Sequence, residues 1–92
     1  MMIRRTPAAL QDLESLHRYV ADDSLSAAAA TVERILSGIE ALSRHPDMGR
    51  KGRVPDTREL IIAPFIVVYR PKAAALELLA MIHSSRRWPD SF

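Results

Sequence analysis

The side chains of this sequence best suited to chemistry are its arginines and one histidine near the C-terminal end. Lysine and arginine together number 13, and 11 of these are arginine. Arginine binds phosphate or carboxylate groups through a planar fork of donors. His83 ends the last apolar segment of the chain, and histidine is the residue type that exchanges protons near neutral pH. The arginines favour a partner that carries negative charge. His83 would in addition allow proton transfer, if the protein is an enzyme.

Positive charge is concentrated in the second half of the chain. Residues 1–43 carry four basic and six acidic side chains, whereas residues 44–92 carry nine basic and five acidic ones. A basic half suits nucleic acid or an acidic peptide as a partner. Because the net charge is only +2, an ordinary solvated surface is the alternative interpretation.

Several other kinds of chemistry find no support in the sequence. It contains no cysteine, so we expect no disulfide framework, thiolate nucleophile or sulfur-based zinc site. Gly49 and Gly52 are not followed by the Lys-Ser/Thr pair of a phosphate loop. Ser84 and Ser85 beside His83 imply no catalytic triad. No His, Asp or Glu set has metal-ligand spacing, so we expect neither a metal nor a cofactor.

The length of 92 residues predicts a single domain, 1–92, with one hydrophobic core. The first residues lack the apolar run of a signal peptide. No segment approaches the roughly 18 apolar residues of a membrane span. We therefore expect a cytoplasmic protein without a membrane partner.

Two amphipathic helices are predicted in the first half. Thr6 is suited to cap the first helix, and Pro7 to occupy its first position. Ser24 or Ser26 can cap the second helix. That helix must end by residue 45, because Pro46 disfavours helical geometry in the residue before it.

Extended segments are predicted on both sides of the helices. Residues 2–6 form the first, and three more follow a loop at 45–56, namely 57–63, 65–70 and 75–83. The short connections between the last three predict an antiparallel meander. The expected fold is α+β with the order β-α-α-β-β-β: a helical hairpin packed on one face of a small, mostly antiparallel sheet, with the first strand at an edge.

Alternation in the last strand predicts which side chains share a face of the sheet. One face would carry Leu76, Leu78, Ala80 and Ile82, and the other Glu77, Leu79, Met81 and His83. We expect the helices to cover the first face, which leaves Leu79 and Met81 on an uncovered one. Uncovered apolar surface indicates a partner, which is the interpretation we favour. The alternative is that the tail, with Trp88 and Phe92, folds back over it.

Five segments of this chain, in this order, resemble the ParE/RelE superfamily of bacterial toxins. They are 7–13 (PAALQDL), 45–50 (HPDMGR), 57–60 (TREL), 65–70 (FIVVYR) and 82–89 (IHSSRRWP). The resemblance spans nearly the whole chain. It implies the toxin of a type II toxin–antitoxin system, neutralised by a ParD-like or RelB-like antitoxin that wraps an extended and helical segment around it.

The resemblance leaves the target open. Members similar to ParE act against DNA gyrase and are not known as nucleases, whereas members similar to RelE cut messenger RNA on the ribosome. A basic nucleic-acid-binding module without toxicity is a third possibility. For the binding of a target or an antitoxin, we expect these residues to contribute: Arg50, Arg53, Arg58, Arg70, Leu79, Met81, Arg86, Arg87 and Trp88.

A RelE-like nuclease would need a proton acceptor for the substrate 2′-hydroxyl, cations for the developing charge and a donor for the leaving oxygen. In this chain Arg58, His83 and Arg86 are the candidates. The sequence departs from the nuclease pattern, because Lys51 is the only lysine of the loop and no tyrosine follows Tyr69. We therefore favour a ParE-like inhibitor of gyrase that acts by contact and has no catalytic residues.

Overall fold

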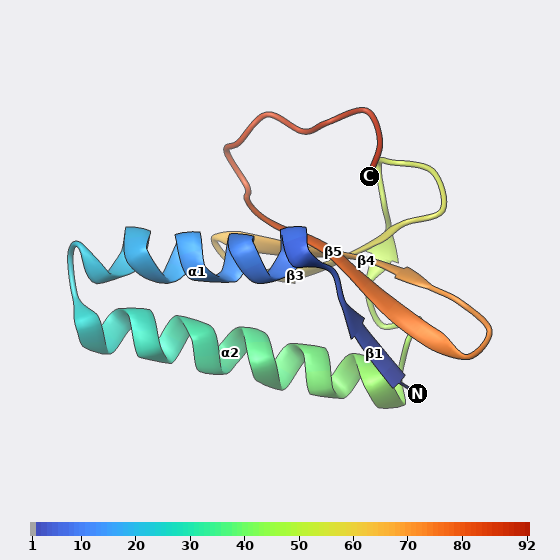
Figure 1. Ribbon diagram of the computed structural model, residues 1–92, viewed down its shortest axis with the longest axis horizontal. Coiled ribbons are helices and arrows are strands. Elements are labelled where there is room, and N and C mark those ends of the chain that lie inside the picture. Colours follow the sequence, from blue (N-terminus) through green and yellow to red (C-terminus); the bar gives the residue numbers. More distant parts are fainter. Residues whose placement is uncertain (1) are drawn as a thin grey trace.

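The computed structural model describes residues 2–92 as two layers, a helical hairpin and a five-stranded sheet (Figure 1). The elements are β1 (Met2–Arg5), α1 (Pro7–Ala21), α2 (Leu25–Arg44), β2 (Arg50–Lys51), β3 (Arg58–Ile62), β4 (Phe65–Pro71) and β5 (Ala75–His83). The strand order is β1-β5-β4-β3-β2. Among the strand pairings of residues 2–92, only that of β1 with β5 is parallel. The predicted α+β class, the helical hairpin and the edge position of the first strand are confirmed.

Both helices begin where local capping predicts. The Thr6 hydroxyl accepts a hydrogen bond from the Ala9 amide at 3.2 Å, and Pro7 is the first helical residue. Of the two candidate caps for α2, Ser24 is the one used, accepting from the Ala27 amide at 3.1 Å. These bonds satisfy backbone donors that have no partner inside the helix.

Strand β2 lies inside the segment that was expected to be a loop. Arg50 and Lys51 pair with Glu59 and Arg58 of β3, so the sheet has one strand more than predicted. Two residues are too few to show an apolar alternation, and their extended conformation comes from a partner strand further along the chain. The expectation of an uninterrupted loop at 45–56 is therefore wrong.

A β-bulge interrupts the pairing of β4 with β5. Val68 pairs with Ala80, but the next residue, Tyr69, pairs with Leu78. Leu79 is thus an extra residue without a partner across the ladder. Because side chains alternate between faces along a strand, one extra residue changes which face every later side chain occupies.

The bulge overturns the expected faces of Ala80, Met81 and Ile82 in β5. Met81 lies on the helix side with Leu76 and Leu78 and is only 5% exposed. Ile82 lies on the opposite face together with Ala80. The predictions that Met81 faces the uncovered side and that Ala80 and Ile82 face the helices are therefore wrong, because strict alternation does not hold across a bulge.

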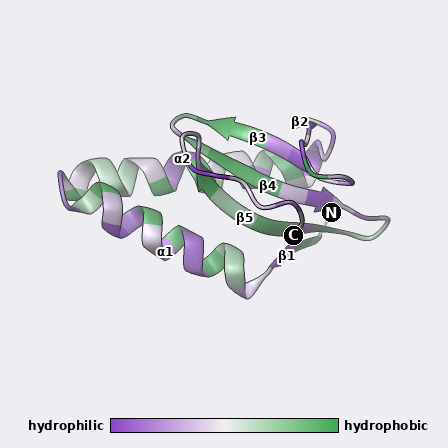
Figure 2. Ribbon diagram, turned by 90° about the horizontal axis from the view of Figure 1, so that it is seen from above, coloured by the Kyte–Doolittle hydropathy of each residue, from purple (hydrophilic) through white to green (hydrophobic). Residues whose placement is uncertain are grey.

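The face of the sheet away from the helices, called here the tail face, is covered by residues 84–92. Its buried residues are Ile66, Val68, Ala80 and Ile82, and Leu79 and Trp88 pack against them. The tail leaves β5 and arches over the sheet toward the β2–β3 loop (Figures 1 and 2). The favoured expectation of an uncovered apolar face is wrong, and the alternative, a tail folded back over it, is correct.

Helix α1 is joined to β5 where β1 ends. The Thr6 hydroxyl donates to the Leu78 carbonyl at 2.7 Å, and the Asp12 carboxylate accepts from the Met81 amide at 3.0 Å. β5 extends past the end of β1. On this part of β5, the Asp12 carboxylate supplies the hydrogen-bond acceptor that the Met81 amide needs. Among residues 2–92, neither helix has the length and hydrophobicity needed to cross a bilayer.

Candidate partner-binding site

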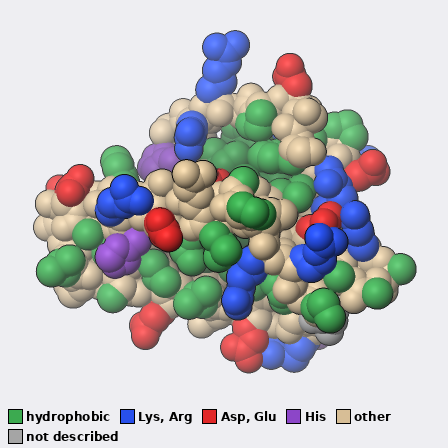
Figure 3. All heavy atoms as spheres, in the orientation of Figure 1, with side chains coloured by type: hydrophobic (Ala, Val, Ile, Leu, Met, Phe, Trp, Pro, Cys, Tyr) green, Lys and Arg blue, Asp and Glu red, His purple; other side chains and the backbone are tan. Residues whose placement is uncertain are grey.

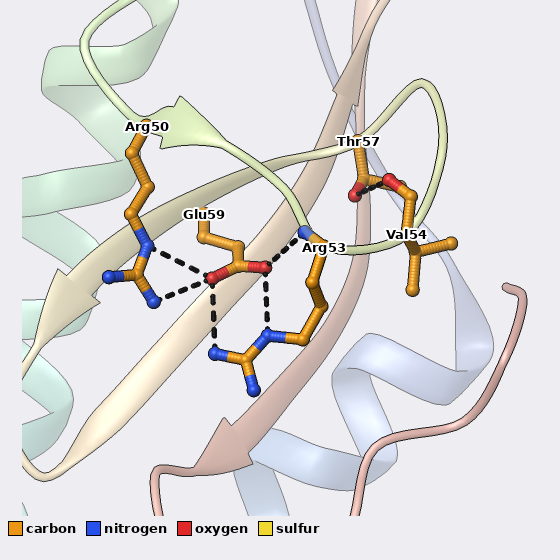
Figure 4. A network of polar contacts seen from close by, with 5 residues as sticks. All are labelled: Arg50, Arg53, Val54, Thr57 and Glu59. Carbon is orange, nitrogen blue, oxygen red and sulfur yellow. Dashed lines mark hydrogen bonds and ion pairs between the residues drawn. The ribbon is translucent and has the colours of Figure 1, made fainter.

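A buried carboxylate in β3 organises the arginines of the β2–β3 region (Figure 4). Glu59 is 2% exposed. It accepts hydrogen bonds from the Arg50 guanidinium at 2.8 and 3.1 Å, from the Arg53 backbone amide at 2.8 Å and from Arg53 Nε at 3.3 Å. A buried charge is tolerated only when it is paired and hydrogen-bonded in this way.

Burial by itself would raise the pKa of Glu59. The hydrogen bonds from the Arg53 backbone, Arg50 and the Arg53 side chain outweigh that effect, and the pKa lies below its ordinary value of 4.5. A carboxyl group whose pKa is lower in the folded state than in the unfolded chain stabilises the fold above the unfolded pKa. This contribution is lost as the pH falls through the folded pKa.

We therefore expect the melting temperature of the protein to fall as the pH is lowered below about 4.5, because Glu59 becomes protonated and its two arginines lose their partner. Glu59→Gln should melt lower near neutral pH and show a flatter acid dependence. Glu14→Gln, which changes an exposed helix residue, is the matched control. Equal acid dependence in wild type and Glu59→Gln, followed by circular dichroism, would contradict this assignment.

Arg53 also contacts the C-terminal tail. The carbon of its guanidinium lies 3.8 Å from the centre of the Trp88 ring, a cation–π contact. Trp88 in turn meets Phe92 edge to face at 6.3 Å. Arg50 and Arg53 both bind Glu59, and Arg53 also contacts Trp88. Three predicted partner-binding residues are thus brought to one region.

Arg58 holds the segment before β2 against the sheet. Its guanidinium donates to the Gly49 carbonyl at 2.6 Å and lies 3.7 Å from the Asp47 carboxylate. Tyr69 of β4 contacts the same segment. Its hydroxyl donates to the Pro46 carbonyl at 2.8 Å and accepts from the Gly49 amide at 2.9 Å. Burial raises the pKa of the Tyr69 phenol. Arg58 and Tyr69 therefore stabilise a loop.

The three candidates for a nuclease centre do not meet in this chain. Arg58 pairs with Tyr69, whereas His83 pairs with Phe65, four residues away along β4. At about 3.4 Å per residue, the two backbone positions are separated by roughly 14 Å along the strand direction. Arg86 is close to His83, since its amide donates to the His83 carbonyl at 2.9 Å. Arg58 lies at the other end.

His83 lines a hollow of about 450 Å³ between α1 and the end of the sheet. Its ring meets Phe65 edge to face at 5.5 Å and Tyr19 at 6.2 Å. The ring Nδ1 accepts from the Ser85 amide at 3.2 Å. Asp12 and Tyr19 also line the hollow, and sequence reasoning missed them there, because nothing in α1 indicates which residues will meet the end of β5.

The remaining predicted residues differ in accessibility. Arg86 and Arg87 are exposed on the tail, Arg70 and Leu79 are half-buried, and Met81 is buried. Basic side chains gather, with acidic ones between them, at the end of the molecule formed by the β2–β3 loop and the β4–β5 hairpin (Figure 3). The surface open to a partner is thus arginine-rich, and Met81 is not part of it.

A helical hairpin packed on a five-stranded mixed sheet is the fold of the small ParE/RelE-type toxins. The family model described as "ParE toxin of type II toxin-antitoxin system, parDE" matches residues 3–88. The chain therefore belongs to the ParE family of type II toxins.

Relatives and a solved structure agree with this family. The chain is 39% identical over 90 residues to Y4kP of Sinorhizobium fredii, an alignment covering 96% of this chain and 93% of Y4kP. It is 32% identical over 85 residues to Toxin RelE3 of Caulobacter vibrioides, covering 88% and 91% of the two chains. A structure titled "Chromosomal ParDE TA system from P. aeruginosa" superposes with a TM-score of 0.78 at 25% identity, covering 90% of this chain and 95% of that one.

Proposed function

We propose that this toxin inhibits DNA gyrase by binding to it, without catalysis, and that a ParD-like antitoxin neutralises it. The match to the ParE family model over residues 3–88 supports this choice of target class, since members similar to ParE act against gyrase. The observation that carries the non-catalytic part is the separation of Arg58 from His83. The cation expected at a nuclease centre is instead hydrogen-bonded to the Gly49 carbonyl.

The tail is the part of the surface best suited to bind gyrase. Arg86 and Arg87 are exposed there, and guanidinium groups are common anchors at protein interfaces. Packing of Trp88 on the tail face holds this segment in one place. We expect acidic and apolar antitoxin residues to cover the arginines of the second half, because arginine–carboxylate pairs gain importance when they are desolvated at an interface.

The experiment that tests the target is expression of the toxin without its antitoxin. Gyrase inhibition predicts filamentous cells and induction of the DNA-damage response. In a parallel assay, the purified toxin should prevent supercoiling of DNA by purified gyrase. Rapid arrest of translation with cut messages would contradict the proposal and indicate a RelE-like ribosome-dependent endoribonuclease. The similarity to Toxin RelE3 makes that nuclease the alternative to test.

We expect His83→Ala to leave toxicity close to that of the wild type, because a binding inhibitor needs no proton transfer. Loss of a general acid or base in a nuclease typically lowers the rate by about 10²–10⁴. Colony counts after induction, with circular dichroism of the purified variant, measure the effect. His83→Gln keeps a hydrogen-bond acceptor for the Ser85 amide and serves if the alanine variant folds poorly.

His45→Ala is the matched control, since His45 lies outside the His83 hollow. A folded His83 variant that lost both toxicity and message cleavage, beside a toxic His45→Ala, would overturn the non-catalytic proposal.

A further inference from the structure

Trp88 is the residue of the tail that packs against the buried residues of the tail face. It packs on the cluster formed by Ile66, Val68, Ala80 and Ile82, and hydrophobic side chains are visible beneath the arch of the tail (Figure 3). Its indole Nε1 is buried and has no hydrogen-bond partner among residues 2–92. No hydrogen bond of the ring therefore selects one orientation, and apolar packing is weakly directional.

The directional contact of Trp88 with a residue outside the tail is the one with Arg53, whose guanidinium lies over the indole ring at 3.8 Å. Arg53 is itself held in place, because both its backbone amide and its Nε donate to the buried Glu59 carboxylate. A guanidinium fixed by a carboxylate loses little further freedom when it contacts an aromatic ring. Glu59 thus holds Arg53, and Arg53 in turn contacts Trp88.

Arg50 provides an internal comparison. Its guanidinium binds the same Glu59 carboxylate at 2.8 Å, but among the described residues only Arg53 lies over the Trp88 ring. Figure 4 shows the two arginines approaching Glu59 from different sides. Loss of either guanidinium weakens the support of Glu59, and only loss of Arg53 releases the indole.

We infer that Arg53, held by Glu59, is a positioning residue that clamps Trp88 and so fixes the tail in the conformation in which Arg86 and Arg87 meet the target. The role of the tail in target binding rests on the function proposed above, whereas the clamp itself does not. A preorganised segment binds more tightly because its ordering cost is met before the complex forms. A released tail would keep its arginines but present them in many conformations.

The chain offers a direct readout of the clamp, since Trp88 is its only tryptophan. We expect Arg53→Gln to move the fluorescence emission to longer wavelength and to increase quenching by acrylamide. A lost cation–π contact corresponds to a shift of about 2- to 30-fold in the ratio of detached to attached tail. Arg50→Gln, the matched control, should keep the emission and quenching of the wild type. Arg53→Lys should fall between, because ammonium lacks the planar face of guanidinium.

Toxicity and gyrase binding are measured on the same variants, with circular dichroism to establish that they fold. A fluorescence change in Arg53→Gln alone, together with weaker gyrase binding, supports the inference. Unchanged fluorescence in a folded Arg53→Gln, or equal changes in both glutamine variants, would overturn the clamp. A fluorescence change with undiminished gyrase binding would overturn the positioning role. Failure of the wild type itself to bind gyrase would contradict the proposed function and leave the fluorescence result intact.

Discussion

Reversing the charges of Arg86 and Arg87 should abolish toxicity while the protein stays folded. Both side chains are exposed on the tail, and the hydrogen bond that joins this turn to β5 uses the Arg86 backbone amide. Each anchor residue lost at an interface typically costs about 2 kcal/mol or more, a factor of roughly 30 in affinity. Glutamate at both positions would add repulsion from an acidic target surface.

Charge reversal is a sharper test than removal of residues 86–92. Truncation would also remove Trp88 and uncover the apolar residues of the tail face, so loss of toxicity could then result from aggregation. Arg86→Glu with Arg87→Glu leaves Trp88 in place. Arg18→Glu with Arg44→Glu makes the same change in net charge on the two helices and is the matched control.

Gyrase binding and colony counts after induction measure the result. Retained toxicity in the folded tail variant, or equal loss in the helix variant, would show that the tail arginines are not the anchor.

Leu78→Ala should cost about 2–5 kcal/mol of the free energy of unfolding. Leu78 is 1% exposed, lies on the helix side of β5 with Ile39 of α2 in the same core, and pairs with Tyr69. A small domain has about 5–15 kcal/mol in total. At about 4–8 °C per kcal/mol for a chain of this size, the melting temperature should fall by about 10 °C or more.

Ile39→Ala removes a side chain of the same core from α2 and should show a similar loss. Leu25→Ala is the control, because Leu25 is 75% exposed and exposed substitutions usually change stability by less than about 0.5 kcal/mol. Thermal unfolding followed by circular dichroism distinguishes them. Wild-type melting of both core variants would contradict the packing of the helical hairpin on this face.

Elements whose ends depend on neighbouring residues could be predicted from the sequence. Thr6 with Pro7, and Ser24, mark the helix starts because a cap acts within three residues of the chain. The long strands were predicted because each carries enough apolar residues to show its own period. The arginine-rich tail and the family resemblance also came from the residues alone.

Features that depend on distant partners were decided only by the tertiary structure. Arg50 and Lys51 form β2 by pairing with β3, and Leu79 is the one extra residue of β5 along its pairing with β4. That single residue determined that Met81 is buried and that Ile82 lies under the tail.

In the candidate site, too, the residue types could be predicted from the sequence, whereas their contacts depend on the tertiary structure. The sequence predicted a set of partner-binding residues that includes Arg50, Arg53, Arg58 and Trp88. It could not show that Glu59 binds two of them or that Arg53 meets Trp88, 35 positions along the chain. Nor could it separate Arg58 from His83, which share a sheet but lie at opposite ends of it. Local propensity is encoded in neighbouring residues, whereas register and the pairing of charges follow from which segments the whole chain brings together.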